Sequence, residues 1–184
     1  MRGLVFTEFI QLVEEKFGVV MADEVLSTPG LTDGGAYTSV GQYPHTEMLA
    51  MVGALSERSG IPASDLCKIF GEWLFPKLAR SFDFSVGAHS DAFSFLASLD
   101  GLIHVEVRKL YPQAELPQVP ITRMDDRELV MEYRSKRPFA DVAEGLLRGT
   151  LAWFGERAEL RREPLDEDTA RSARFRIIRK AAAR

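Results

Sequence analysis

Residues 117–137 read PQVPITRMDDRELVMEYRSKR, and this stretch separates a helical region from a region of strands. It contains two short strand-like runs, 119–123 and 128–134, in which apolar and β-branched residues recur. The polar tripeptide between them, DDR at 125–127, is typical of a hairpin turn. The stretch therefore predicts two neighbouring antiparallel strands.

The sequence after this hairpin predicts one helix and two further strands. Residues 139–154 have apolar side chains at helical spacing, and runs 156–162 and 173–178 are strand-like around an acidic turn at 163–168. The Arg-rich end, 171–184, contains no acidic residue. We expect it to form an edge strand with alternating charges, followed by a frayed tail.

The sequence before the hairpin is predominantly helical. Its apolar spacing predicts helices over 4–17, 21–26, 44–60, 62–78 and 91–111, and a Gly/Ser/Thr-rich loop over 27–42. Pro76 predicts a kink or an early end in the fourth of these helices, and 91–111 is expected to be the longest uninterrupted one. Helices followed by strands predict an α+β fold, in which a helical N-terminal subdomain packs on a C-terminal antiparallel sheet of roughly four strands with a helix.

Composition limits the classes of protein that the chain can represent. Its 184 residues are 46% hydrophobic and 27% charged, with a formal net charge of −4, which excludes a largely disordered chain. This charge does not favour nucleic-acid binding, and no apolar run approaches the roughly 20 residues that span a membrane. Cys67 is the single cysteine and has no partner for an internal disulfide, so we expect a reducing, cytoplasmic setting.

His104 is the histidine whose setting suggests chemistry. His45 and His89 lie in loop or cap contexts, whereas His104 is predicted to be mid-helix, leaning over Gly101 and Asp100. Glycine destabilises a helix interior by about 1 kcal/mol relative to alanine, so Gly101 needs a packing reason. The spacing leaves two interpretations open, a hydrogen-bonded core histidine and a ligand to a metal or a haem.

Tyr133, Ser135 and Arg137 alternate at the end of the second predicted strand. Alternation places their side chains on one face, which would carry a phenol, a hydroxyl and a guanidinium. All three donate hydrogen bonds, and they suit a pair of carboxylates or a phosphate. The equally plain alternative is an ordinary polar outer face of a strand.

No catalytic motif accompanies these residues. Asp100 and Glu106 flank His104, but there is no nucleophile motif, no Gly-rich phosphate loop and no second histidine at metal-binding spacing. We therefore expect a protein that is not an enzyme.

Taken together, these residues resemble the haem-nitric oxide/oxygen binding family (H-NOX), which is similar to the haem domain of soluble guanylate cyclase. The similarity covers 1–178, nearly the whole chain. It implies that residues 1–184 form a single domain. The elements that carry it are the MRGLV start at 1–5, His104 followed thirteen residues later by Pro117, the Tyr133-x-Ser135-x-Arg137 motif, and Gly145-Leu146-Leu147 with Gly149.

The resemblance implies a haem b held between a distal helical subdomain (1–60) and a subdomain containing the proximal helix and the sheet (61–184). His104 would ligate the iron. Tyr133, Ser135 and Arg137 would hold the propionates, and Pro117 would press on the porphyrin, with Gly101 leaving room beside it. The gas pocket would be lined by Val5, Phe9, Leu74, Leu78, Val142 and Leu146.

The resemblance also implies the ligand. Oxygen-binding members carry a tyrosine on the helix after the Arg motif, where this chain has Val142, so we expect a nitric oxide sensor that also binds carbon monoxide and forms no stable oxygen complex. Nitric oxide would loosen the Fe–His104 bond, and the helical subdomain would rotate. The signal would pass to a separately encoded histidine kinase or diguanylate cyclase.

Two other functions remain open from the residues. One is a haem-free helical binding module for an apolar carboxylate such as a fatty acid, held by Tyr133, Ser135 and Arg137. The other is a structural adaptor that uses its basic C-terminal strand and binds no ligand.

Overall fold

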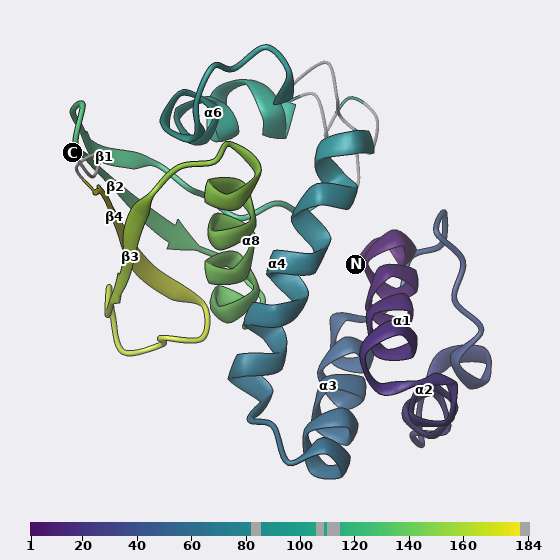
Figure 1. Cartoon of the computed structure of the whole chain (residues 1–184). Helices are drawn as coiled ribbons and strands as arrows, with labels where there is room; N and C mark the ends of the chain where they lie inside the picture. Colours follow the sequence, from purple (N-terminus) through teal and green to yellow (C-terminus); the bar gives the residue numbers. More distant parts are fainter. Residues whose placement is uncertain (82–85, 106–108, 110–114, 181–184) are drawn as a thin grey trace.

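Figure 1 shows the computed structural model, which describes residues 1–81, 86–105, 109 and 115–180. Helices α1 to α3 form one side, the sheet forms the other, and α4 with α8 runs between them. The elements in chain order are α1 (Gly3–Phe17), α2 (Val19–Leu26), a 3₁₀ turn η1 (Thr32–Gly35), α3 (His45–Ser59), α4 (Ala63–Ser81), α6 (Ala92–Ser98), a π-helical turn η2 (Leu99–Ile103), β1 (Ile121–Met124), β2 (Glu128–Arg134), α8 (Ala140–Trp153), β3 (Ala158–Glu163) and β4 (Ser172–Arg179).

The predicted α+β fold is confirmed, and it has two hydrophobic cores. In the N-terminal core, α1 buries Phe6, Phe9, Leu12 and Val13 against α2, α3 and the first part of α4. In the C-terminal core, one face of the sheet packs against α8 and α6. The boundary between the cores is where a ligand cavity would be expected.

Helix α4 belongs to both cores. Leu66 and Phe70 lie in the N-terminal core, whereas Phe75 and Ala79 lie in the C-terminal core. Of the two outcomes expected at Pro76, a kink or an early end, the early end is wrong, because α4 continues to Ser81. Proline costs a helix interior about 3 kcal/mol, and the apolar contacts of α4 on both sides of Pro76 offset that loss.

The four strands form one antiparallel sheet in the order β1-β2-β4-β3. The edge position expected for the C-terminal strand is therefore wrong, since β4 lies between β2 and β3. Its inward side chains, such as Phe175, are buried. Its outward Arg176 pairs with Glu128 of β2 at 2.6 Å and with Glu163 of β3 at 3.1 Å. Carboxylates on both neighbouring strands thus pair with the arginine charges that had indicated an edge strand. The frayed tail expected at 181–184 lies outside the described residues.

The uninterrupted helix expected over 91–111 is also wrong, because the α-helix is interrupted after Ser98. It begins as predicted, with Asp91 accepting a hydrogen bond from the backbone of Ser94 at 2.8 Å. After Ser98 the helix widens into the π turn η2, which contains Gly101. Glycine destabilises the interior of an α-helix, so the regular helix is weakest at Gly101. Such π turns are frequent at functional sites. Glu106 and the expected end at 111–112 lie outside the described residues.

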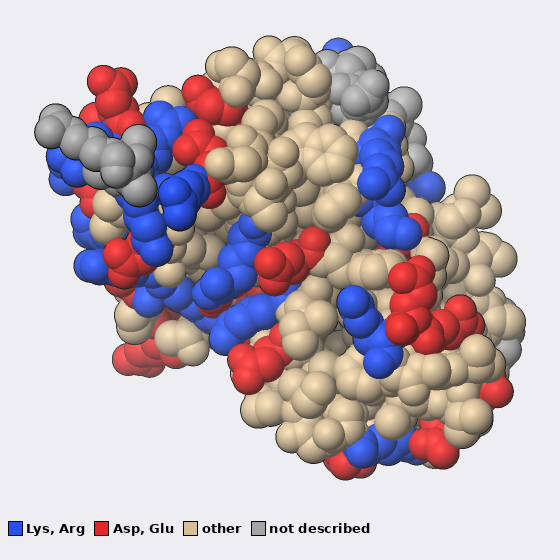
Figure 2. Space-filling view, viewed as in Figure 1, with Lys and Arg blue, Asp and Glu red and all other residues tan. Residues whose placement is uncertain are grey.

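The surface carries charges of both signs. Figure 2 shows Lys and Arg side chains mixed with Asp and Glu over the sheet side, and larger uncharged areas over the helices. None of the helices in the described part of the chain combines the length and apolar character needed to cross a bilayer.

Candidate functional site

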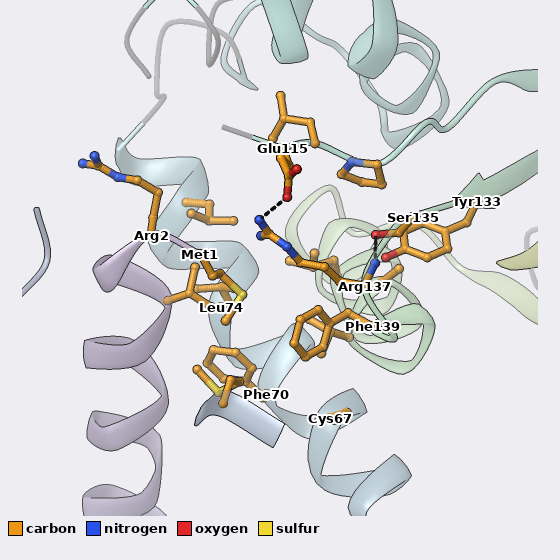
Figure 3. Close-up of a pocket in the computed structure, with 18 of the residues that line it drawn as sticks. Met1, Arg2, Cys67, Phe70, Leu74, Glu115, Tyr133, Ser135, Arg137 and Phe139 are labelled. Carbon is orange, nitrogen blue, oxygen red and sulfur yellow. Dashed lines mark hydrogen bonds and ion pairs between the residues drawn. The ribbon is translucent and has the colours of Figure 1, made fainter. Parts of the chain in front are cut away.

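A cavity of about 300 Å³ lies where the two cores meet. Figure 3 shows Met1, Phe70 and Leu74 around it, with Tyr133, Ser135 and Arg137 reaching toward it from the sheet side. Helices α3, α4 and α8 supply most of the apolar walls. These wall residues are Val5, Met48, Val52, Cys67, Phe70, Leu74, Leu78, Phe139, Val142, Ala143 and Leu146.

Tyr133, Ser135 and Arg137 all line the cavity, but strand alternation accounts for only one of them. Strand β2 ends at Arg134, so Ser135 and Arg137 lie in the turn that follows. The segment around Arg171 holds the turn that carries Ser135 and Arg137, since the Ser135 backbone N–H donates to the Arg171 carbonyl at 2.9 Å. The Arg171 Nε donates to the Lys136 carbonyl at 3.2 Å. Strand β2 therefore places Tyr133, and the contacts with Arg171 hold the turn that places Ser135 and Arg137 beside it.

These donors are preorganised by burial and local hydrogen bonds. Tyr133 is 4% exposed, and burial raises the pKa of its phenol, which keeps it protonated and able to donate. The Ser135 Oγ accepts from the Arg137 backbone N–H at 3.1 Å. The Arg137 guanidinium, with its side chain 19% exposed, donates to the Glu115 carboxylate at 2.7 Å. The site therefore binds a carboxylate at Arg137 through a short charge-assisted bond.

Pro117 lies against the same cavity because its segment pairs with the end of β2. Gln118 and Arg134 exchange two backbone hydrogen bonds of 2.9 Å each. This bridge places Leu116 and Pro117 among the lining residues beside the Arg137 turn.

His104 is buried, 9% exposed, directly after the π turn. Its Nδ1 lies 3.2 Å from the Asp100 Oδ1, and the same carboxylate accepts from the Val119 backbone N–H at 3.2 and 3.3 Å. Among the described residues, no atom lies within 4 Å of a Cβ added at Gly101, so they leave open space beside that residue. Asp100 thus ties the histidine to the segment that carries Pro117.

The structure brings most of the predicted site residues together. Val5, Leu74, Leu78, Val142, Leu146, Pro117, Tyr133, Ser135 and Arg137 line the cavity, whereas Phe9, Gly101 and His104 are not among its lining residues. Phe9 lies one layer behind, with its ring edge-on to Phe70 at 5.3 Å.

Other lining residues were not predicted. Met48, Val52 and Phe70 follow the helical apolar spacing of the sequence, which indicates burial but does not separate a cavity wall from core packing. Cys67 lines the same wall. Burial raises the pKa of the Cys67 thiol to about 11. Three polar residues, Arg2, Gln42 and Glu115, also line the cavity. Arg2 belongs to the MRGLV start, whereas no motif marks Gln42 or Glu115. Gln42 is exposed, and Arg2 extends away from the cavity in Figure 3.

The loop tyrosines Tyr37 and Tyr43 do not line this cavity. Tyr37 stacks on Phe6 at 4.6 Å and donates to the buried Glu47 carboxylate at 2.6 Å. The Tyr43 hydroxyl accepts from the Thr38 backbone N–H at 2.9 Å. Among the described lining residues, the buried Tyr133 on the sheet side is therefore the one that carries a phenol.

A family model described as haem-NO-binding (HNOB) matches residues 2–162. The chain belongs to this family. Solved relatives are similar to this haem-NO-binding chain over nearly their whole length. The Fe(II) unliganded H-NOX protein from K. algicida is 35% identical, with a TM-score of 0.93 over 99% of this chain and 98% of that one.

Two further haem-NO-binding structures were solved with gases on the iron. The IWP-051-bound H-NOX from Shewanella woodyi, in the Fe(II)CO state, is 42% identical, with a TM-score of 0.82 over 98% of this chain and 95% of that one. The S. oneidensis H-NOX protein in the Fe(II)NO state is 26% identical, with a TM-score of 0.89 over 98% of this chain and all 100% of that one.

A longer relative is Soluble guanylate cyclase 89Db of Drosophila melanogaster, 34% identical over 98 residues. The match covers 52% of this chain but only 14% of that protein. The activity of the longer protein therefore gives no direct assignment for this chain.

The donor set of the haem-NO-binding chain fits a haem. The described residues include no group of three or more His, Cys, Asp or Glu side chains that could hold a bare metal ion. A single histidine suffices for an iron already held by a porphyrin. The apolar walls suit a macrocycle, and Arg137 binds a carboxylate in the structure.

Proposed function

We propose that this chain is a haem-based sensor of nitric oxide, with haem b held between residues 1–60 and 61–184, and that it is not itself an enzyme. The observation that carries the proposal is one cavity that combines apolar walls with the hydrogen-bond donors Tyr133, Ser135 and Arg137 on its sheet side. Relatives solved in unliganded Fe(II), NO and CO states support it.

In this proposal His104 ligates the iron, and Tyr133, Ser135 and Arg137 bind the propionates. When Nδ1 donates to Asp100, Nε2 carries the lone pair that a metal requires, and the carboxylate strengthens the basicity of that nitrogen. Pro117 and the space beside Gly101 accommodate the ring. Bound haem supplies the iron site at which a diatomic gas coordinates.

The apolar walls favour nitric oxide and carbon monoxide over oxygen. A hydrogen-bond donor stabilises oxygen bound to iron. The side chains that α1, α3, α4 and α8 contribute to the walls are predominantly apolar, as at Val142. Tyr37 and Tyr43, the loop residues that could have supplied a donor, are engaged elsewhere. The Cys67 thiol is a weak donor.

For signalling, we propose that His104 loosens its hold on the iron when nitric oxide binds. Asp100 transmits the change, because it contacts both His104 and Val119. The helical part can then rotate against the sheet part and present a different surface. A histidine kinase or diguanylate cyclase must prefer one of these states by about 1–3 kcal/mol for the coupling to matter.

The test is the absorption spectrum of the ferrous protein, first bare, then in air and then after nitric oxide. The proposal predicts a Soret band, no persistent oxygen complex, and a shifted band with nitric oxide. A persistent oxygen complex would contradict the gas selectivity. A colourless protein that refuses hemin and instead binds a fluorescent fatty acid would favour the haem-free binding module.

A further inference from the structure

Glu115 lies at the mouth of the cavity and contacts two of the basic side chains there. Its Oε2 accepts a hydrogen bond from the Arg137 Nη2 at 2.7 Å. Its Oε1 lies 3.6 Å from the Lys136 Nζ. Figure 3 shows Glu115 extending toward Arg137, with a dashed line between the carboxylate and the guanidinium. The cation that would receive a guest carboxylate already binds one from its own chain.

The position of Glu115 is built into the fold. The paired backbones of Gln118 and Arg134 hold the segment just after Glu115 against the segment that leads to Arg137. The hydrogen bond from Arg137, followed by its positive charge, lowers the pKa of Glu115, so this carboxylate is ionised at neutral pH. Glu115 therefore presents a negative charge within hydrogen-bonding distance of Arg137, where a guest carboxylate would bind.

Two carboxylates cannot share this guanidinium without a cost. Arginine binds a carboxylate best through both arms of its fork, and a second carboxylate in contact removes one arm and adds like-charge repulsion. Lys136 offers Glu115 an alternative partner, since the lysine side chain is 85% exposed and already lies close. Glu115 can thus leave Arg137 without burying its charge.

We propose that Glu115 competes with the haem propionate for Arg137 and so sets how long the chain retains haem. The inference rests on the proposed function, because the propionate is the guest. When the propionate binds Arg137, Glu115 turns to Lys136.

The experiment compares haem loss from the full chain and from Glu115→Gln, both loaded with hemin and mixed with an excess of a haem scavenger. The variant should lose haem about two- to fivefold more slowly, the range expected for one exposed ion pair. The difference should shrink in 1 M salt, where exposed charges are screened. Thermal unfolding of the haem-free proteins checks that both fold alike.

Two controls isolate the competition. Glu159→Gln removes another exposed carboxylate that pairs with an arginine, Arg161, at 2.7 Å, and it should leave haem loss unchanged. Hemin dimethyl ester has no charged propionate, so Glu115→Gln and the unmodified chain should release it at the same rate.

Equal rates of hemin loss, or faster loss from Glu115→Gln, would overturn the inference while leaving haem binding intact. Faster loss would mean that Glu115 positions Arg137 instead of competing for it. If neither protein shows a Soret band with hemin, the proposed function fails and the competition fails with it.

Discussion

Gly71 on α4 and Gly145 on α8 form a direct backbone contact between the two central helices. A Cβ at Gly71 would lie 2.2 Å from the Val142 carbonyl oxygen, and a Cβ at Gly145 would lie 2.1 Å from the Lys68 carbonyl oxygen. Both obstacles are backbone atoms, so neither can move aside by a rotamer change. The contact holds together the two helices that supply Leu74 and Val142 to the cavity.

Gly71→Ala should therefore destabilise the fold. Forcing α4 and α8 apart costs about 1–3 kcal/mol, the range for an overpacked interior. Denaturant unfolding of the haem-free chain measures it. Gly53→Ala is the matched control, because Gly53 lies inside α3 and no atom of the described residues lies within 4 Å of an added Cβ. That change should stabilise by about 0.5–1 kcal/mol; an equal effect at both positions would contradict the close contact.

Glu47 is buried in the N-terminal core and holds the loop before α3. Burial alone would raise the pKa of its carboxyl, but hydrogen bonds from Thr32 and Tyr37 outweigh burial and lower the pKa below its ordinary 4.5. A lowered folded-state pKa contributes stability above pH 4.5 that is lost as the pH falls through the folded-state value. Glu47→Gln should cost about 1–3 kcal/mol at pH 7.

Unfolding of the Glu47→Gln chain across pH checks this assignment. The gap between the two proteins should narrow as the pH is lowered below 4.5, because the carboxylate then protonates in both the folded and the unfolded chain. A gap that stays constant down to pH 3 would show that the charge of Glu47 is not what holds the loop.

Cys67 should be nearly inert in the folded protein. With a pKa of about 11, about one thiol in a thousand is ionised at pH 8, and the thiolate is the reactive form. The side chain is also buried, at 7% exposed. Iodoacetamide followed by mass spectrometry should show no labelling in hours and full labelling in denaturant. Rapid labelling of the native chain would mean that the cavity wall opens.

Asp100→Asn should weaken haem binding while the local fold persists. Asparagine keeps an acceptor for the Val119 backbone N–H but removes the charge beside His104. Loss of such a supporting contact lowers metal affinity by about 10–100-fold. The Fe–His stretching frequency in resonance Raman spectra should fall as well. Asp126→Asn, in the exposed β1–β2 turn, should change neither quantity, and an unchanged Asp100→Asn would contradict the role of Asp100.

The sequence predicted the regular elements well where periodicity was strong. Helices at 3–17 and 140–153 and all four strands lie within about two residues of their expected limits. The errors arose where tertiary contacts decide. Pro76 stays helical because both cores hold α4, and β4 is central because its arginines find carboxylates on both sides.

The candidate site was predicted by residue type more than by geometry. Tyr133, Ser135 and Arg137 line one cavity as expected, but a turn held by Arg171 places two of them. The π turn before His104 leaves no periodic signal in the sequence. Glu115 could not have been predicted, because its proximity to Arg137 depends on the pairing of Gln118 with Arg134.

The most direct test of His104 as the iron ligand is the resonance Raman spectrum of ferrous His104→Gly with and without imidazole. The variant should lose the Fe–His band that the unmodified chain shows, and added imidazole should restore a band from an iron–nitrogen bond. A variant that keeps the original band without imidazole would prove that another side chain holds the iron.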